Sequence, residues 1–341
     1  MDFWYLENLV CPRDYSRLTF KNEQLCCQNE HNYPVVEGVP VMLLDDIDHN
    51  IRVAYNSIKR SKGELIDLRS PDLYLESLGI SEVEKLLAIS LIGKTSIDPI
   101  VSVLIGATSG NMYKRLIGKL KTYPIPELRL EKGQGGRLLD IGCGWGRWSI
   151  AAYKLGYQVV GIDPSLGAIM AARRVANSLG FDIKYVVADG RNLPFSNKYF
   201  DIIFSYSVLQ HLNKQNVEAC LEEISRILRN GGYSFIQVAN KFGIRSFYHQ
   251  LKRKFRKPVN FEVRYWRPLE LTFVFNKFIG KTSLEVDSYL GLGIQKSDFR
   301  LMPTHYKMII IVSEMLKKLN KSITFLTYLA DSVYAKSIKR C

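Results

Sequence analysis

The sequence lacks the features that mark membrane-spanning, fibrous or disordered proteins. It has no apolar run of 18 residues, so no segment is typical of a membrane-spanning helix. Its 24 Gly and 12 Pro show no period, which excludes a collagen-like or low-complexity fibre. Hydrophobic residues make up 47% and charged residues 23% of the 341 positions, a balance that excludes disorder over most of the chain.

Cysteine is also scarce, with six residues in the whole chain. This number is too low for the dense disulfide scaffold of a small secreted protein. The start Met1-Asp2-Phe3-Trp4 has neither the basic first part nor the apolar core of a signal peptide. We therefore expect a cytoplasmic protein.

Positive charge is abundant but unevenly distributed. The net charge is +14, yet residues 1–50 hold 3 Lys and Arg against 9 Asp and Glu. Residues 51–240 hold 24 against 17, and residues 241–341 hold 20 against 7. The basic C-terminal region includes Lys-Arg-Lys-Phe-Arg-Lys at 252–257. Such a cluster is typical of RNA-binding segments, of peripheral contacts with the inner membrane face, and of plain solvated loops.

Four regions differ in their patterns. Residues 1–44 contain short strand-like runs divided by turn residues, which predicts a small β-rich domain. Residues 45–130 show helical spacing, as a helical linker or lid would. Residues 131–241 alternate strand and helix patterns, and residues 242–341 mix basic helical segments with late strands. We expect the last region to form a lid and to supply strands that close the core sheet.

The third region predicts an α/β fold with a doubly wound sheet. Short apolar strands are expected at 136–141, 158–162, 182–188, 200–205 and 233–239. A helix at 217–229 is expected to end at Gly231-Gly232. Sheets of this kind bind ligands at the carboxyl ends of their strands.

A glycine loop follows the first of these strands. The dinucleotide-binding pattern Gly-x-Gly-x-x-Gly would need a glycine where Arg147 stands. The chain has Asp140-x-Gly142-x-Gly144-x-Gly146 instead. A carboxylate at position 140 would repel a pyrophosphate, but it suits the amino group of a methionine moiety. The loop therefore favours a cofactor that contains methionine.

The region around this loop resembles the Rossmann-like S-adenosylmethionine-dependent methyltransferases, in particular those grouped with ubiquinone-biosynthesis methyltransferases. The resemblance covers about 110 residues and follows the order expected of the fold. Its motifs are Leu-Leu-Asp-Ile-Gly-Cys-Gly-Trp-Gly at 138–146, Val-Val-Gly-Ile-Asp-Pro-Ser at 159–165, Ala-Asp-Gly-Arg-Asn-Leu-Pro-Phe at 188–195, Phe-Asp-Ile-Ile-Phe-Ser-Tyr-Ser-Val-Leu-Gln-His-Leu at 200–212 and Ile-Leu-Arg-Asn-Gly-Gly at 227–232.

The resemblance implies a set of cofactor-binding residues. They are Asp140, Gly142, Cys143, Gly144, Asp163, Asp189, Gly190 and Ser205. The glycine loop with Cys143 would lie under the methionine part. Asp163 would accept hydrogen bonds from the ribose hydroxyls, Asp189 from the adenine amino group, and Ser205 would flank the sulfonium. The two aspartates are also residue types that cap helices and form turns.

A hydroxyl acceptor would be helped by a general base, and His211 is the first candidate. It follows the fourth predicted strand, on the side where the acceptor would enter. It is equally placed to be a structural residue at a helix start. His249, Tyr265 and Asp298 are weaker candidates, and a nitrogen or carbon acceptor could need no base.

The N-terminal region contains a partial zinc-ligand pattern. Cys11 and Asp14 form one pair and Cys27 and His31 the other, with Asp14 where a ribbon usually has cysteine. Carboxylate can ligate zinc, so these four residues are chemically able to form a site. The alternative is a metal-free β-rich domain.

The same region resembles the short zinc-ribbon family of methyltransferase activator proteins. Cys11-Pro12 and Tyr-Pro-Val-Val-Glu-Gly-Val-Pro-Val-Met-Leu at 33–43 carry this resemblance over about 43 residues. In that family the ribbon docks on methyltransferases as a separate protein, and here it would be fused. Similar ribbons precede some ribosomal-RNA guanine methyltransferases, but the acidic charge of residues 1–50 argues against a grip on phosphates.

We therefore expect an S-adenosylmethionine-dependent methyltransferase that acts on oxygen. The favoured acceptor is a small molecule, a saccharide or a lipid-linked intermediate. RNA base methylation is the first alternative, and a non-catalytic module that docks partners is the second. The sequence leaves the oligomeric state open.

Overall fold

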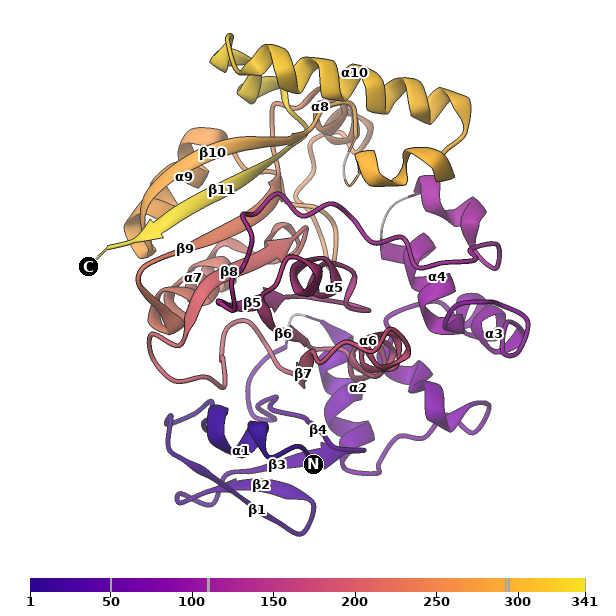
Figure 1. The fold of residues 1–341 in the computed structure, drawn as a ribbon, viewed down its shortest axis with the longest axis vertical. Helices are drawn as coiled ribbons and strands as arrows, with labels where there is room; N and C mark the ends of the chain where they lie inside the picture. Colours follow the sequence, from indigo (N-terminus) through magenta and orange to yellow (C-terminus); the bar gives the residue numbers. More distant parts are fainter. Residues whose placement is uncertain (50, 109–110, 292, 294, 341) are drawn as a thin grey trace.

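The computed structural model describes residues 1–49, 51–108, 111–291, 293 and 295–340. A seven-stranded sheet forms its centre, with strand order β10-β11-β9-β8-β5-β6-β7 and helices on both faces (Figure 1). The strands are β5 (Arg137–Ile141), β6 (Gln158–Asp163), β7 (Lys184–Val187), β8 (Phe200–Tyr206), β9 (Leu228–Ala239), β10 (Gly280–Ser288) and β11 (Ser332–Lys339). The helices that follow them are α5 (Arg147–Lys154), α6 (Leu166–Ser178), α7 (Lys214–Ile227), α8 (Ile244–Lys252), α9 (Pro268–Phe278) and α10 (Thr304–Asn320).

The sheet is parallel from β7 to β9 and antiparallel at its other end. β5 pairs in parallel with β6 and β8, while β11 pairs antiparallel with both β9 and β10. This order confirms the predicted α/β fold with a Rossmann-like sheet. It also brings the carboxyl ends of β5, β6 and β8 to one edge, where the glycine loop lies.

Side chains of successive residues in the central strands lie in two different hydrophobic clusters, one on each face of the sheet. Leu138 lies in the cluster that contains α5 and α6, and Leu139 lies in the cluster that contains α7 and α9. Ile202 and Ile203 divide in the same way. Both faces of a parallel sheet must be covered, so its strands read as continuous apolar runs.

A smaller sheet covers the β7 edge of the large one. Its four antiparallel strands are β1 (Leu18–Lys21), β2 (Gln24–Cys27), β3 (Asn32–Val36) and β4 (Val39–Pro40), with α1 (Trp4–Asn8) before them. The backbone N–H of Met42 donates to the carbonyl of Val187 at 2.7 Å, and that of Val10 to Pro194 at 3.1 Å. The small sheet therefore pairs with groups that an exposed edge strand would leave open.

Residues 45–130 fold as helices packed onto the large sheet's helical layer. They include α2 (Arg52–Ser61), α3 (Glu82–Ser90) and α4 (Pro99–Thr108). The Ser57 hydroxyl, which is fully buried, donates to the Pro164 carbonyl at 2.7 Å and accepts from the Leu166 N–H at 2.9 Å. Because Leu166 begins α6, Ser57 satisfies one of the N–H groups that a helix start leaves without a partner.

A buried ion pair joins the helical region, the core and the C-terminal region. Arg147, directly after the glycine loop, pairs with Asp298 of the 3-10 helix η5 (Lys296–Leu301). The Tyr113 hydroxyl, from the 3-10 helix η3 (Asn111–Leu116), donates to the same carboxylate. Arg147 Nε also donates to the Pro124 carbonyl at 2.8 Å. The Asp298 carboxylate is therefore bound to Arg147 and Tyr113. It is not available as the general base that the sequence analysis considered.

Two expected elements differ from the structure. Gly231-Gly232 does not end a helix, because the chain passes from α7 directly into β9 at Leu228. The two glycines lie inside the strand, where the pairing with β8 shifts register and a Cβ at Gly232 would stand 2.7 Å from the Asp201 carbonyl. The apolar spacing of residues 306–329 likewise predicts a pair of amphipathic helices, but only α10 is a long helix and the second half is the short 3-10 helix η6 (Thr324–Leu329).

The described residues include no helix that is both long and apolar enough to cross a membrane.

The substitution Ser57→Ala tests how α2 is attached. It should lower the free energy of unfolding by about 1–3 kcal/mol, because the Leu166 N–H and the Pro164 carbonyl lose a buried partner. Ser61→Ala is the matched control, since the Ser61 hydroxyl bonds only to Ile58 of its own helix. Urea unfolding of both variants measures the difference, and equal stabilities would reject the attachment.

Candidate functional site

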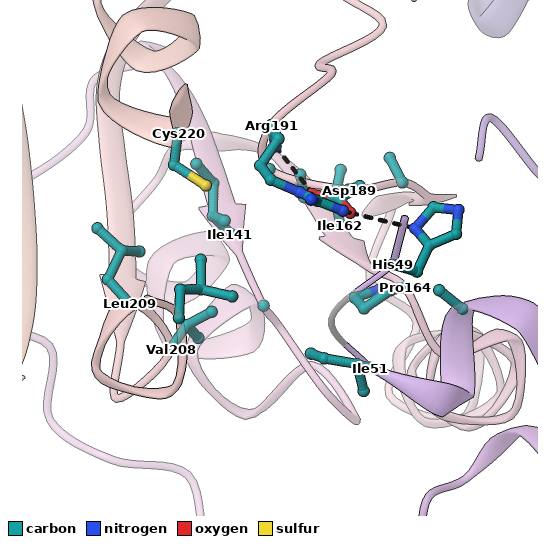
Figure 2. A pocket seen from close by; sticks show the side chains of 15 residues that line it. His49, Ile51, Ile141, Ile162, Pro164, Asp189, Arg191, Val208, Leu209 and Cys220 are labelled. Atoms are coloured by element: carbon teal, nitrogen blue, oxygen red, sulfur yellow. Dashed lines mark hydrogen bonds and ion pairs between the residues drawn. The ribbon is translucent and has the colours of Figure 1, made fainter. Parts of the chain in front are cut away.

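A pocket opens at the carboxyl edge of the parallel strands (Figure 2). About 530 Å³ of space free of protein atoms lies between its walls, part of it open to solvent. Its walls are mainly aliphatic, with one carboxylate and two basic side chains. The lining residues are His49, Ile51, Ala54, Ile141, Gly142, Ile162, Pro164, Ala188, Asp189, Gly190, Arg191, Val208, Leu209, Leu212 and Cys220.

The glycine loop has a backbone that only glycine adopts without strain. Gly142 has φ +72° and lines the pocket, where a Cβ would stand 2.3 Å from Val208 Cγ2. Gly144 has φ +53°, and a Cβ there would meet nothing within 4 Å. At Gly144 the loop therefore presents bare backbone to open space, which a closely bound ligand can use.

Asp163 holds the glycine loop in place. Its two carboxylate oxygens accept the N–H groups of Gly144 at 3.0 Å and Ser165 at 2.9 Å. Burial raises the pKa of the Asp163 carboxyl to about 6. A carboxylate oxygen can accept more than one hydrogen bond, so these two bonds leave acceptor capacity for ribose hydroxyls.

Asp189 lies in the pocket wall between two basic side chains. Arg191 donates to both of its oxygens, with the shortest bond from Nη2 at 2.7 Å, and His49 Nδ1 lies 3.4 Å from Oδ2 (Figure 2). Burial alone would raise the pKa of Asp189, but the bonds from His49 and Arg191 outweigh it and hold the pKa well below its usual range. Asp189 is therefore a permanently ionised acceptor beside the pocket.

Three other predicted residues lie behind the pocket lining. Asp140 is buried and accepts the Ser149 hydroxyl at 2.6 Å, and burial raises the pKa of its carboxyl to about 7. Burial also raises the pKa of the Cys143 thiol, so Cys143 fills space in the loop and is not a reactive thiolate. The Ser205 hydroxyl is fully buried and donates to the Ile141 carbonyl at 2.9 Å.

Of the eight predicted cofactor residues, Gly142, Asp189 and Gly190 line the pocket itself. Asp163 and Gly144 border the pocket through the glycine loop, whereas Asp140, Cys143 and Ser205 lie behind its lining. Contact of these five residues with a cofactor stays a prediction. His49 was missed because nothing in its local sequence marks it. It is 5% exposed, its Nε2 lies 2.6 Å from the Leu44 carbonyl, and its Nδ1 faces Asp189 Oδ2 at 3.4 Å.

His211 lies next to the pocket on the 3-10 helix η4 (Leu209–His211), whose first residue Leu209 lines it. The His211 ring stacks on Phe261 with centroids 3.9 Å apart, and Nδ1 lies 2.7 Å from the Phe261 carbonyl. Burial lowers the pKa of His211. The carbonyl fixes the proton on Nδ1, so Nε2 carries the lone pair that a base needs.

A polar cluster ties together the strand ends beside this region. Asp287, fully buried at the end of β10, accepts from the Tyr206 hydroxyl at 3.0 Å, Gln237 Nε2 at 3.1 Å and the Ser332 hydroxyl at 2.8 Å. Arg129 Nη2 lies 3.5 Å from its other oxygen. These side chains come from β8, β9, β10 and β11, so one carboxylate fixes four strand ends.

The four predicted metal ligands lie together in the N-terminal sheet. One ligand atom from each of Cys11, Asp14, Cys27 and His31 lies within 4.8 Å of the others. His31 Nδ1 is 3.4 Å from Cys11 Sγ, 3.3 Å from Cys27 Sγ and 3.4 Å from Asp14 Oδ2, and Cys27 Sγ is 3.8 Å from Asp14 Oδ2. Tetrahedral zinc with ordinary bond lengths separates such ligand atoms by about 3.4–3.8 Å. The donor set therefore fits zinc in kind and in spacing.

Comparison with known proteins places a domain within the chain. Residues 138–232 match the family described as "Methyltransferase domain". "Ubiquinone biosynthesis O-methyltransferase" of Pelagibacter ubique is 37% identical over 105 residues, which are 31% of this chain and 42% of that protein. The protein of the same name from Rhizobium etli is 32% identical over 108 residues, 32% of this chain and 43% of that protein. The chain thus matches less than half the length of these relatives.

Among solved structures, a SAM-dependent methyltransferase from Methanosarcina mazei is 18% identical, with a TM-score of 0.44 over 62% of this chain and 94% of that one. The family match covers β5 through the first part of β9 together with the glycine loop, Asp163 and Asp189. Residues 138–232 therefore match a methyltransferase domain, and they contain the parallel strands of the Rossmann-like sheet described above.

Proposed function

We propose that the chain is an S-adenosylmethionine-dependent O-methyltransferase whose acceptor is a small molecule, a saccharide or a lipid-linked intermediate. The observation that carries this proposal is the pocket, in which Gly142, Asp189 and Gly190 of the matched domain meet beside the loop fixed by Asp163. Oxygen as the acceptor atom is supported by the names of the two ubiquinone-biosynthesis relatives.

The bound cofactor would supply a methyl group on a sulfonium, which is already a good leaving group. The chain's own residues then have to bind, orient and exclude water. Asp163 provides acceptors for the ribose hydroxyls and Asp189 for the adenine amino group. Ile162 and Leu209 provide apolar walls for the adenine ring. His211 would take the hydroxyl proton of the acceptor on Nε2.

Transfer of a labelled methyl group tests the proposal. The protein is incubated with methyl-labelled S-adenosylmethionine and separated lipid, glycan, small-molecule and RNA fractions. We expect label in one of the first three fractions, and mass spectrometry of the product should place it on oxygen. Label confined to RNA, or label in none of the fractions, would contradict the proposal.

Two glycine variants sharpen this experiment. Gly142→Ala should lose cofactor binding and transfer, because the new Cβ collides with Val208. Gly180→Ala is matched to it, with φ +70° against +72° and no atom within 4 Å of the new Cβ. Gly180→Ala should keep both activities, so the comparison separates the pocket from general backbone strain.

Cofactor affinity should depend on pH through Asp163. The pKa of this buried carboxyl is raised to about 6, so it gains a proton as the pH falls below that value and loses its charge-assisted bonds to ribose. The dissociation constant should be steady above about pH 7 and rise by up to tenfold per pH unit below about pH 6. Calorimetry across this range measures it.

The variant Asp163→Asn provides the control for this dependence. It should weaken binding by about 1–3 kcal/mol at neutral pH, because a charged acceptor is replaced by a neutral one. The remaining pH profile should be flatter than that of the native protein. A variant with unchanged affinity would remove Asp163 from the cofactor site.

We further propose that Cys11, Asp14, Cys27 and His31 bind one zinc ion that stabilises the N-terminal sheet. The spacing of their donor atoms supports this. Asn29 Nδ2 donates to Asp14 Oδ2 at 2.6 Å and the Ser16 hydroxyl donates to Oδ1, so the unusual carboxylate ligand is oriented by its neighbours. A closed set of four protein ligands is typical of structural zinc.

Elemental analysis of the purified protein should find one zinc per chain. Cys27→Ala should lose the zinc and lower the melting temperature, and a chelator should do the same to the native protein. Cys26→Ala is the matched control, because Cys26 lies one residue away and its sulfur contacts only the Gln24 carbonyl. Metal-free native protein with an unchanged melting temperature in chelator would refute the zinc site.

A further inference from the structure

Helix α8 has its apolar face toward solvent. Ile244, Phe247, Tyr248, Leu251 and the following Phe255 recur at helical spacing, and each is between 51% and 57% exposed. The inward face carries Ser246 and Gln250, whose side chains bond to the Asp331 and Lys241 carbonyls. A helix of an ordinary globular domain has the reverse arrangement. This apolar face therefore has no partner among the described residues.

Helix α10 shows the same periodicity on its outer face. Met308, Ile311, Val312, Met315 and Leu319 are between 38% and 59% exposed. The segment after it adds Ile323 at 53% and Phe325 at 66%. Ordinary surfaces scatter single apolar residues, whereas this pattern repeats over three turns of helix.

A series of hydrogen bonds links the two helices through the segment between α10 and β11. The Ser246 N–H of α8 donates to the Asp331 carboxylate at 2.7 Å, and Asn240 Nδ2 donates to the Tyr328 carbonyl of η6 at 2.9 Å. The Thr327 hydroxyl of η6 donates to Asn320 at the end of α10 at 3.0 Å. In Figure 1 both helices lie at the end of the molecule away from the N-terminal sheet. We call this set of residues, 242–261 and 304–329, the C-terminal face.

The charge around the C-terminal face is almost entirely positive. Residues 241–262 contain seven Lys and Arg and one acidic residue, Glu262, which pairs with Arg256, and residues 304–325 contain four Lys and one Glu. Lys252, Lys254 and Lys257 are exposed beside the apolar residues of α8. Apolar side chains surrounded by lysine and arginine are the composition of helices that lie in a membrane interface.

We propose that the C-terminal face docks on the surface of an anionic lipid bilayer, with the apolar residues of α8 and α10 inserted between headgroups. A basic rim alone would fit RNA as well, but ten or more exposed aliphatic and aromatic side chains gain nothing from a phosphate backbone. Lipid satisfies both parts of the face, because acyl chains take the apolar residues and phosphate headgroups take the lysines. This inference goes beyond the proposed catalysis and does not depend on it.

Vesicle flotation tests the docking directly, without cofactor or acceptor. The full chain should float with vesicles of equal parts phosphatidylcholine and phosphatidylglycerol, and bind phosphatidylcholine vesicles far more weakly. The bound fraction should fall as salt rises. The variant Lys252→Gln/Lys254→Gln should lower the partition coefficient by about fivefold for each lysine removed. The variant Phe247→Ser/Leu251→Ser should lower it by at least about tenfold through loss of apolar insertion.

Matched variants elsewhere on the chain control for charge and for apolar exposure. Lys21→Gln/Lys59→Gln removes the same charge from exposed positions of β1 and α2, and Leu269→Ser/Phe273→Ser removes exposed apolar residues from α9. Both should leave vesicle binding unchanged. Equal binding to neutral and anionic vesicles, or equal losses in control and test variants, would overturn the proposal. So would concentration-dependent self-association that the Phe247→Ser/Leu251→Ser variant abolishes, since the face would then join copies of the chain.

Cofactor calorimetry on the same samples keeps the two proposals apart. If the chain binds S-adenosylmethionine but no anionic vesicle, the docking proposal alone is refuted. If the chain binds anionic vesicles but no S-adenosylmethionine, the proposed methyltransferase activity alone is refuted.

Discussion

The buried ion pair between Arg147 and Asp298 fixes the segment after the glycine loop against two regions that lie outside the matched domain. Two charges out of water are stable only when each has its partner, and a single one left there costs several kcal/mol. Arg147 leaves the glycine loop, Asp298 belongs to the C-terminal region, and Tyr113 reaches the same carboxylate from the helical region. The segment that follows the glycine loop is therefore held by one region that precedes the matched domain in the sequence and by another that follows it.

The pocket is composite for the same reason. The methyltransferase domain supplies its floor through Gly142 and Asp189, whereas His49, Ile51 and Ala54 come from a segment that the family match does not reach. Ser57 fixes that segment to the first turn of α6, immediately after the Asp163 turn. Regions outside the domain thus complete the pocket, so its shape can differ between proteins that share the domain.

The sequence predicted what depends on local pattern. The strands of the core, the glycine loop and the clustering of Cys11, Asp14, Cys27 and His31 follow from apolar periodicity and fixed spacing. It failed where tertiary contacts decide. Gly231-Gly232 is a sound helix end by local rules, yet β9 uses it to approach Asp201. Nothing in the sequence around Asp298 indicates its buried partner Arg147. Nothing in the sequence around His49 indicates that it lines the pocket. Such residues are recognised only when distant segments are seen together.

The pairing of the small sheet with β7 has a consequence for synthesis on the ribosome. The Met42 N–H donates to the Val187 carbonyl of β7. The ribosome adds about 140 more residues after Met42 before this strand is made. At about 5–20 residues per second, this delay is roughly 7–30 s. During that time the small sheet lacks the edge strand against which it packs. A nascent chain thus carries two unfinished sheets, each of which leaves bare the edge that the other will cover.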